Sequence, residues 1–330
     1  MNAPTITQEQ IELFIKLNGI FSPSARAKRD VVYDDRDSAR FVHYTSAEAA
    51  LSIIQTKRLW MRNTTCMTDY REVQHGYDLL NQFFSNKEKN GEFVNALDLC
   101  SPNTGEKGIG LFNQWWADIR FNTFLASFSE HDDTENSHGR LSMWRAFGGN
   151  SARVAIVLNI PRTGSLTRPL HITFNPVTYP KENDINAEID QVISNVKSNR
   201  DFLKTVEPDM LINHVFNMLV TNVTCLKHEG FKEEREWRAI YSPNRWASFA
   251  TERAVETIGG IPQVVYKLAL DKNVSEDIAY LDFARLFERL IIGPTQYPSA
   301  QKNAFVVALK DAGVRDAEER VFPSGIPIRT

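Results

Sequence analysis

Apolar residues recur at helical spacing in several stretches of the chain. Residues 7–19 place Ile11, Phe14 and Ile15 at positions i, i+3 and i+4, which predicts a short amphipathic helix. The same periodicity, with Ser46 as a cap and Gly313 as a stop signal, predicts further helices. They span residues 46–54, 70–84, 112–120, 185–204, 209–224 and 301–312.

Short apolar runs between polar segments predict β-strands. They lie at residues 41–45, 59–61, 124–128, 152–158, 237–241, 264–268 and 290–294. Between them, we expect residues 85–91 to form a turn and residues 129–139 to form a long exposed loop. Because strands and helices are interleaved without regular alternation, the pattern indicates an α/β or α+β domain with helical insertions rather than a doubly wound sheet.

Charge separates the N-terminal part from the rest of the chain. Residues 22–40 are rich in basic and acidic side chains and show no clear periodicity, so we expect an irregular, solvated arm. We therefore divide the chain into an N-terminal helix with a charged arm, residues 1–40, and a single domain, residues 41–330. This domain would carry a helical insertion near residues 185–224.

The composition is that of a globular protein. Of the 330 residues, 42% are apolar, and the formal net charge of −3 gives no overall attraction to nucleic acids or anionic membranes. The three cysteines show no C-x-x-C spacing, which argues against a disulfide framework and favours a reducing compartment. No signal pattern and no run of roughly 18 apolar residues occurs, so we expect a soluble, cytoplasmic protein without a membrane partner.

The first candidate for chemistry is the tripeptide His43-Tyr44-Thr45. It ends the first predicted strand and directly precedes the helix that Ser46 caps. Side chains and free backbone groups at such strand ends often face a cleft. The alternative interpretation is a core histidine whose ring is bonded to the backbone.

The second candidate is the acidic pair Glu234 and Glu236, close to Arg238. If residues 234–241 are extended, these three side chains share one face. Two carboxylates beside an arginine are costly to bury, so they should line a solvated cleft or form a charge network; a ladder on an edge strand is the alternative. Such a pair suits glycosidic chemistry, in which one acid stabilises an oxocarbenium-like transition state and the other orients the nucleophile.

Two further groups of residues could bind ligands. Trp60 and Tyr70 could stack on a flat ring, and Arg58 or Arg62 could neutralise a phosphate, although a core tryptophan and surface arginines are the simpler alternative. A metal-dependent nuclease would need His131, Asp133 and His138 of the 129–139 loop to converge on an ion. A solvated acidic loop explains that composition better, so we expect no metal.

Several segments carry a family resemblance because they occur in one order along the chain. They are F-V-H-Y-T at 41–45, R-L-W-M-R-N at 58–63, M-T-D-Y-R-E at 67–72, L-A-S-F-S-E at 125–130, S-M-W-R-A-F at 142–147, E-E-R-E-W-R at 233–238 and R-L-I-I-G-P at 289–294. Over about residues 40–315 the chain resembles an uncharacterised bacterial family of domains of unknown function. That family in turn resembles the ADP-ribosyltransferase superfamily.

The resemblance implies an α+β fold with a split, mainly antiparallel sheet core that grips NAD, the co-substrate, in a cleft. His43 would bond the adenosine-side ribose, and the Tyr44 backbone would hold the nicotinamide amide. Thr45 belongs to the same binding motif. Glu236 would match the catalytic glutamate, and Glu234 would be the upstream acid of the E-x-E turn. The aromatic residue that stacks on the nicotinamide would be Trp60 or Tyr70.

The function implied by the resemblance is that of an NAD-dependent ADP-ribosyltransferase, a glycosyltransferase-class enzyme. Many proteins with this core act as bacterial toxins or anti-phage defence effectors, so the acceptor would be RNA, DNA or protein, and a neutralising antitoxin could be a partner. The alternative is a non-catalytic module on the same fold that binds a nucleotide or a partner. On the first hypothesis, Glu236→Gln should leave folding intact and remove NAD hydrolysis or transfer.

Overall fold

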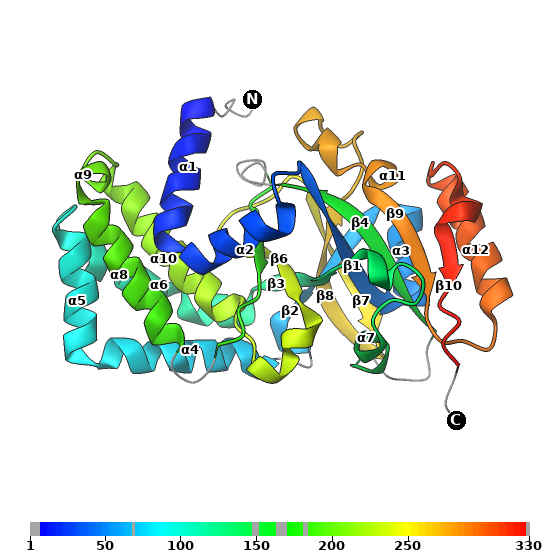
Figure 1. Ribbon diagram of the computed structural model, residues 1–330, viewed down its shortest axis with the longest axis horizontal. Helices are drawn as coiled ribbons and strands as arrows, with labels where there is room; N and C mark the ends of the chain where they lie inside the picture. The colour runs from blue at the N-terminus through cyan, green and yellow to red at the C-terminus, as the bar shows by residue number, and fades with distance from the viewer. Residues whose placement is uncertain (1–6, 68–69, 147–151, 163–169, 181–183, 328–330) are drawn as a thin grey trace.

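The computed structural model describes residues 7–67, 70–146, 152–162, 170–180 and 184–327. It contains one mixed β-sheet and a group of helices that lies beside the sheet rather than only over its faces (Figure 1). The fold is therefore α+β, as the sequence predicts.

Ten strands of the described residues form the sheet. They are β1 (Ser38–Ser46), β2 (Arg58–Asn63), β3 (Phe124–Glu130), β4 (Arg153–Pro161), β5 (Ile172–Pro176), β6 (Glu236–Tyr241), β7 (Thr251–Ile258), β8 (Ile261–Ala269), β9 (Phe287–Ile292) and β10 (Val321–Pro323). Their order is β10-β9-β4-β1-β3-β2-β8-β7, with β6 on β3 and β5 on β6. The pairs are antiparallel apart from β9 with β10.

Strand β3 has two partners on one edge. Near its end, β1 pairs with it at Phe41 and Val42, and near its start, β2 pairs with it at Arg62 and Asn63. Between these contacts, residues 126–128 pair with neither strand on that edge, although β6 pairs with β3 along the other edge. The sheet therefore opens between β1 and β2.

One face of the sheet carries the larger hydrophobic core. Phe41, Phe128 and Trp237 belong to it, together with Tyr33 from the preceding helix. The helices that contribute side chains to this core or pack against these strands are α2 (Pro23–Tyr33), α3 (Ala47–Thr56), α11 (Phe283–Leu286) and α12 (Pro298–Asp311). On the opposite face, the short helix α7 (Leu141–Ala146) supplies Met143 and Trp144 to a smaller cluster.

The remaining helices build a second hydrophobic core of their own. They are α1 (Gln8–Phe21), α4 (Tyr70–Ser85), α5 (Lys87–Asp98), α6 (Thr104–Phe121), α8 (Asp184–Ser198), α9 (Arg200–Leu203) and α10 (Pro208–Thr224). In Figure 1 they gather on the left, away from α12. Helices α6 and α10 pack closely, since a Cβ on Gly108 would lie 2.4 Å from the Val215 Cγ1.

Short 3₁₀ helices connect several of these elements. They are η1 (Thr64–Cys66), η2 (Asp133–Glu135), η3 (Glu229–Glu234), η4 (Glu276–Leu281) and η5 (Ala317–Arg320). No helix in the described part of the chain has the length and apolar character that a membrane crossing requires.

Most of the predicted elements are present, but the predictions for residues 22–40 and 85–91 are wrong. Residues 22–40 are not an irregular solvated arm, because they hold α2 and the start of β1, and Tyr33 is fully buried. In helix α2, Tyr33 enters the core, while most of the charged side chains of the helix lie outside it. The hydrophobic periodicity of this segment is therefore weak. The expected turn at residues 85–91 is also wrong, since Asn86 caps α5 by accepting from the Glu88 and Lys89 amides.

Candidate functional site

His43 bridges β1 and β3 beside the opening between β1 and β2. Its Nδ1 lies 2.8 Å from the Ser127 carbonyl oxygen, and its ring packs against Phe128 with centroids 5.4 Å apart. A carbonyl oxygen only accepts, so Nδ1 carries the hydrogen. Burial lowers the pKa of His43, although the bond to Ser127 opposes this shift. The imidazole is therefore neutral near pH 7.

Tyr44 combines a fixed side chain with an open backbone edge. Its hydroxyl accepts from the Arg140 amide at 2.8 Å, and its ring meets Trp144 edge-on. The Arg40 carbonyl accepts from the His131 amide, so the backbone groups of Arg40 point toward β3. Backbone groups of every second residue in a strand point to the same side, so those of Tyr44 also point toward β3. The β1–β3 pairing ends at Val42. The Tyr44 backbone groups therefore face the opening without a strand partner.

Glu236 lies in a buried charge network at the start of β6. Its carboxylate accepts from Arg238 at 2.8 and 3.1 Å and from Lys227 at 3.5 Å, and only 5% of the residue is exposed. The Ser127 hydroxyl also bonds to it. Burial would raise the pKa of Glu236, but Arg238 and Lys227 outweigh it, so the pKa is lowered and the carboxylate stays charged.

Glu234 joins the same network, but not from an extended strand as predicted. It ends η3, and Arg235 follows in the left-handed region with φ 45°, so residues 234 and 235 are not part of an extended strand. The prediction of one extended face is correct for Glu236 and Arg238 and wrong for Glu234. Lys227 nevertheless joins the two acids, since its Nζ lies 2.8 Å from Glu234 Oε2.

This network changes the expectation for Glu236→Gln. Removal of the carboxylate charge would leave Arg238 and Lys227 buried, at 2% and 3% exposure, without that partner. Uncompensated buried charge is strongly destabilising. The substitution therefore should weaken the fold, contrary to what the sequence alone suggests.

His43 and Glu236 are connected through Ser127 but lie on opposite faces of the sheet. Side chains alternate along a strand, and His43 shares the face of Phe128 and Trp237, whereas Glu236 is on the other face from its neighbour Trp237. The Ser127 carbonyl contacts His43, and the Ser127 hydroxyl contacts Glu236. Ser127 of β3 therefore contacts both candidates, which lie on opposite faces of the sheet.

The candidates on β2 lie toward the other end of β3. Trp60 has a buried indole Nε1 without a hydrogen-bond partner, and Lys267 Nζ lies 5.0 Å from its ring centroid. Arg62 donates to Gln263 at 3.0 Å and to the Cys66 carbonyl at 2.7 Å, and burial lowers its pKa. The Tyr70 side chain lies outside the described residues. Thr45, the last residue but one of β1, lies on the same face as His43, opposite Val154 of β4.

The polar loop after β3 holds the acidic turn in place. Arg140 donates to the Glu233 and Glu234 carbonyls at 2.8 and 2.9 Å, and Arg235 binds Asp132 and Glu135 at 3.0 and 2.6 Å. The expectation of a fully exposed loop is wrong, because this network buries part of it. The loop thereby fixes the backbone from which Glu234 and Glu236 project.

The residues considered for a metal site bind other protein groups. His131 is 6% exposed and its Nε2 lies 3.1 Å from Asn136 Oδ1, Asp133 pairs with Arg40 at 2.6 Å, and His138 contacts the Ser324 carbonyl. Within the described residues, no group of three or more His, Cys, Asp or Glu side chains is arranged to hold a metal ion.

Sequence reasoning missed four residues that build this site. Ser127, Tyr179, Lys227 and Arg140 each contact a candidate or its backbone, and the Tyr179 hydroxyl accepts from the Glu236 amide at 2.8 Å. One signal was present for Ser127: serines at 127 and 129 in an otherwise apolar strand indicate a face that does not enter the core. The others come from turns and loops whose positions only the fold determines.

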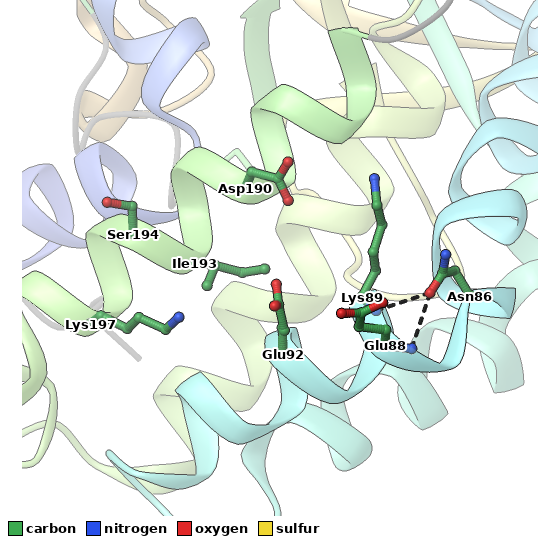
Figure 2. A pocket seen from close by; sticks show the side chains of 8 residues that line it. All are labelled: Asn86, Glu88, Lys89, Glu92, Asp190, Ile193, Ser194 and Lys197. Atoms are coloured by element: carbon green, nitrogen blue, oxygen red, sulfur yellow. Dashed lines mark hydrogen bonds between the residues drawn. The ribbon is translucent and has the colours of Figure 1, made fainter.

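Two cavities lie away from these residues. One, of about 520 Å³, lies between α5 and α8, where Glu92, Asp190 and Lys197 line it (Figure 2). Its lining mixes both charges with a single apolar residue, Ile193. The other, of about 420 Å³, lies where β4, β9 and β10 meet. Neither cavity is lined by His43 or Glu236.

A family model gives the first comparison with known proteins. Residues 143–239 match a family described as protein of unknown function (DUF2971). The match covers less than a third of the chain; it includes Lys227, Glu234, Glu236 and Arg238 but neither His43 nor Ser127. No curated protein and no solved structure matches the chain.

Proposed function

We propose that the protein is an NAD-dependent ADP-ribosyltransferase that acts on a macromolecular acceptor, RNA, DNA or protein. The observation that carries the proposal is the connection from His43 through Ser127 to Glu236. It joins an imidazole and a charged carboxylate at the point where the sheet opens. A dinucleotide offers both a ribose and a nicotinamide amide to such an opening.

The residues present are suited to holding NAD. The open backbone edge of Tyr44 offers an N–H and a carbonyl, which are complementary to a carboxamide. His43 is neutral, and its Nδ1 already donates to Ser127, which leaves Nε2 as an acceptor for a ribose hydroxyl. NAD would supply the glycosidic bond between nicotinamide and ribose, whose cleavage leaves positive charge on the sugar.

The charge network prepares Glu236 for that chemistry. A fixed carboxylate stabilises positive charge that develops in the transition state more than it stabilises the ground state. Arg238 and Lys227 keep Glu236 ionised inside the protein, and the Tyr179 hydroxyl fixes its backbone amide. Glu234 shares Lys227, so a shift of Lys227 toward Glu234 would leave Arg238 to hold both oxygens of Glu236.

One observation favours a second candidate, a non-catalytic module that binds a nucleotide or a partner. Both oxygens of Glu236 are already hydrogen-bonded to cationic side chains, and the carboxylate lies on the face opposite to His43. A carboxylate so engaged can serve the fold alone. On this alternative the opening at Tyr44 would bind a ligand without turning it over.

Nicotinamide release separates the two candidates. Purified protein is incubated with NAD labelled in the nicotinamide ring, with and without cell lysate, and the free nicotinamide is measured. We expect release to fall on the order of 10²–10³-fold in Glu236→Gln. Saturable NAD binding without release would support the binding module. The absence of both NAD binding and nicotinamide release would refute the transferase and any module that binds NAD.

Because Glu236→Gln should also weaken the fold, a charge-balanced variant is needed. Glu236→Gln with Lys227→Met removes one negative and one positive charge from the network and leaves Glu234 with Arg238. A matched control is Glu256→Gln, which breaks a salt bridge to Lys267 on the β7–β8 hairpin. Release should be absent in the double variant and unchanged in the control. If the folded double variant released nicotinamide as fast as the parent, Glu236 would not be the catalytic glutamate.

A further inference from the structure

The cavity where β4, β9 and β10 meet gathers three arginines from three different elements. Arg285 comes from α11, Arg289 from β9 and Arg320 from η5. Like charges repel one another, so their convergence on one cavity of about 420 Å³ opposes folding unless something compensates for it. The identity of the compensating groups indicates whether the cavity has room for a negative ligand.

The acidic residues of the cavity compensate only part of this charge. Glu288 lines it, but Arg40, which is not among the lining residues, holds the Glu288 carboxylate with two hydrogen bonds of 2.8 and 2.6 Å. Arg289 Nε also lies 3.3 Å from the same carboxylate, so Glu288 is shared between Arg40 and Arg289. Glu319 is exposed at the rim. Arg285 and Arg320 form no salt bridge within the described residues, and Glu319 is the remaining carboxylate of the lining.

The arginines also retain unused donors. Arg289 is fixed over the Phe322 ring at 5.2 Å and uses two nitrogens, which donate to the Asn136 carbonyl at 3.2 Å and to Glu288 at 3.3 Å. Arg320 uses one nitrogen, at 3.2 Å from the Phe287 carbonyl. Arg285 is exposed, and no residue in the described part of the chain accepts a hydrogen bond from its guanidinium. An arginine carries five N–H donors, so most of them remain available.

We propose that this cavity binds the phosphoryl group of a small phosphorylated molecule. Guanidinium forks match the oxygens of a phosphate in paired hydrogen bonds, and three forks from different directions suit a tetrahedral anion better than a planar carboxylate. The Phe322 ring, held beside Arg289, supplies an apolar wall for the rest of the molecule. The site is separate from Glu236 and does not depend on the proposed transferase activity.

Calorimetric titration of the full chain with inorganic pyrophosphate tests the proposal. The ionic strength is held low and constant, because salt weakens such contacts. Arg285→Gln and Arg320→Gln remove donors from the cavity, while Arg253→Gln makes the same charge change on the exposed strand β7, at the other end of the strand order. We expect saturable binding that weakens on the order of tenfold in each cavity variant and stays unchanged in the control.

The results of these titrations distinguish a specific phosphate site from nonspecific attraction between the anion and a charged surface. Arg285 is exposed and bonds to no described residue, so its variant should fold even if Arg320→Gln does not. Absence of binding, or equal weakening by Arg253→Gln, would overturn the proposal. Titration with ADP then identifies the source of the phosphate: tighter binding than pyrophosphate indicates a nucleotide, and equal binding indicates recognition of the phosphates alone. Neither readout involves nicotinamide, so this test and that of the transferase fail independently.

Discussion

Arg238 donates hydrogen bonds to both oxygens of Glu236, two positions away on the same face of β6, at 2.8 and 3.1 Å. The pair is buried, and Lys227 supplies a second cation that Glu234 shares. Two acids and two bases thus form one balanced unit. Each substitution in it should therefore be judged by the charge that remains.

Glu236→Gln should lower the free energy of unfolding by about 3–5 kcal/mol, because it leaves buried cations short of a partner. Urea denaturation measures the change. Addition of Lys227→Met should recover a substantial part of the loss, since it restores the balance between Glu234 and Arg238. Equal stability of parent and single variant would show that the network does not contribute to the fold.

Stability should decrease below neutral pH because of His43. Burial lowers the pKa of His43 in the folded protein, whereas the unfolded chain takes up this proton near pH 6.5. The unfolded state therefore binds more protons as the pH falls from 7.5 to 5.5, and the free energy of unfolding decreases, for this group by about 1 kcal/mol. The decrease should be smaller in His43→Gln than in the parent by that amount. Parallel pH profiles of parent and variant would contradict the assignment.

Ser127→Ala removes the hydroxyl that bonds to the Glu236 carboxylate. We expect it to destabilise the protein by about 1–2 kcal/mol, as for hydrogen bonds to charged groups. Because this bond helps to lower the pKa of Glu236, the acidic limb of the pH profile of nicotinamide release should move to higher pH. Ser127→Thr keeps a hydroxyl and should retain the parent profile. If Thr and Ala variants behaved alike, the hydroxyl would have no role.

Two glycines of α6 should respond in opposite directions to alanine. A Cβ at Gly108 would lie 2.4 Å from Val215 Cγ1 on α10, whereas a Cβ at Gly110 would meet nothing within 4 Å. Gly108→Ala should therefore destabilise the protein by about 1–3 kcal/mol through overpacking. Gly110→Ala should stabilise it by about 0.5–1 kcal/mol, the usual gain in an exposed helix. Thermal unfolding of the two variants side by side tests the packing of the second core.

The sequence predicts the elements whose patterns are strong. The strand at 41–45 and the Ser46 cap are present, and Ser46 accepts from the Ala49 amide. Helix α12 ends where Gly313 adopts a φ of 87°. These features depend on local chemistry, which the residues themselves determine. The edge strands β5, β7 and β10 were missed, because their polar or short sequences acquire strand character only from neighbours.

The candidate site is harder to predict than the fold. The pairing of Glu236 with Arg238 follows from a two-residue period and was foreseen. The separation of His43 and Glu236 onto opposite faces depends on the β1–β3 and β3–β6 registers, which no local pattern encodes. Lys227 reaches both acids because α10 ends at Thr224, just before it, and that placement belongs to the packing of the helices.

The molecule has two main hydrophobic cores, one against the sheet and one among the helices, and we expect each to unfold as a cooperative unit. A chain whose apolar contacts fall into two groups opens in two units, each with its own exchange rate for backbone amides. The amides of α6 and α10 should exchange together, at a rate distinct from those of β1 and β4. Arg238 donates to the Thr224 carbonyl at the end of α10, at 2.7 Å. The charge network of Glu236 therefore links the sheet to the helices, and we expect local unfolding of one to affect the other.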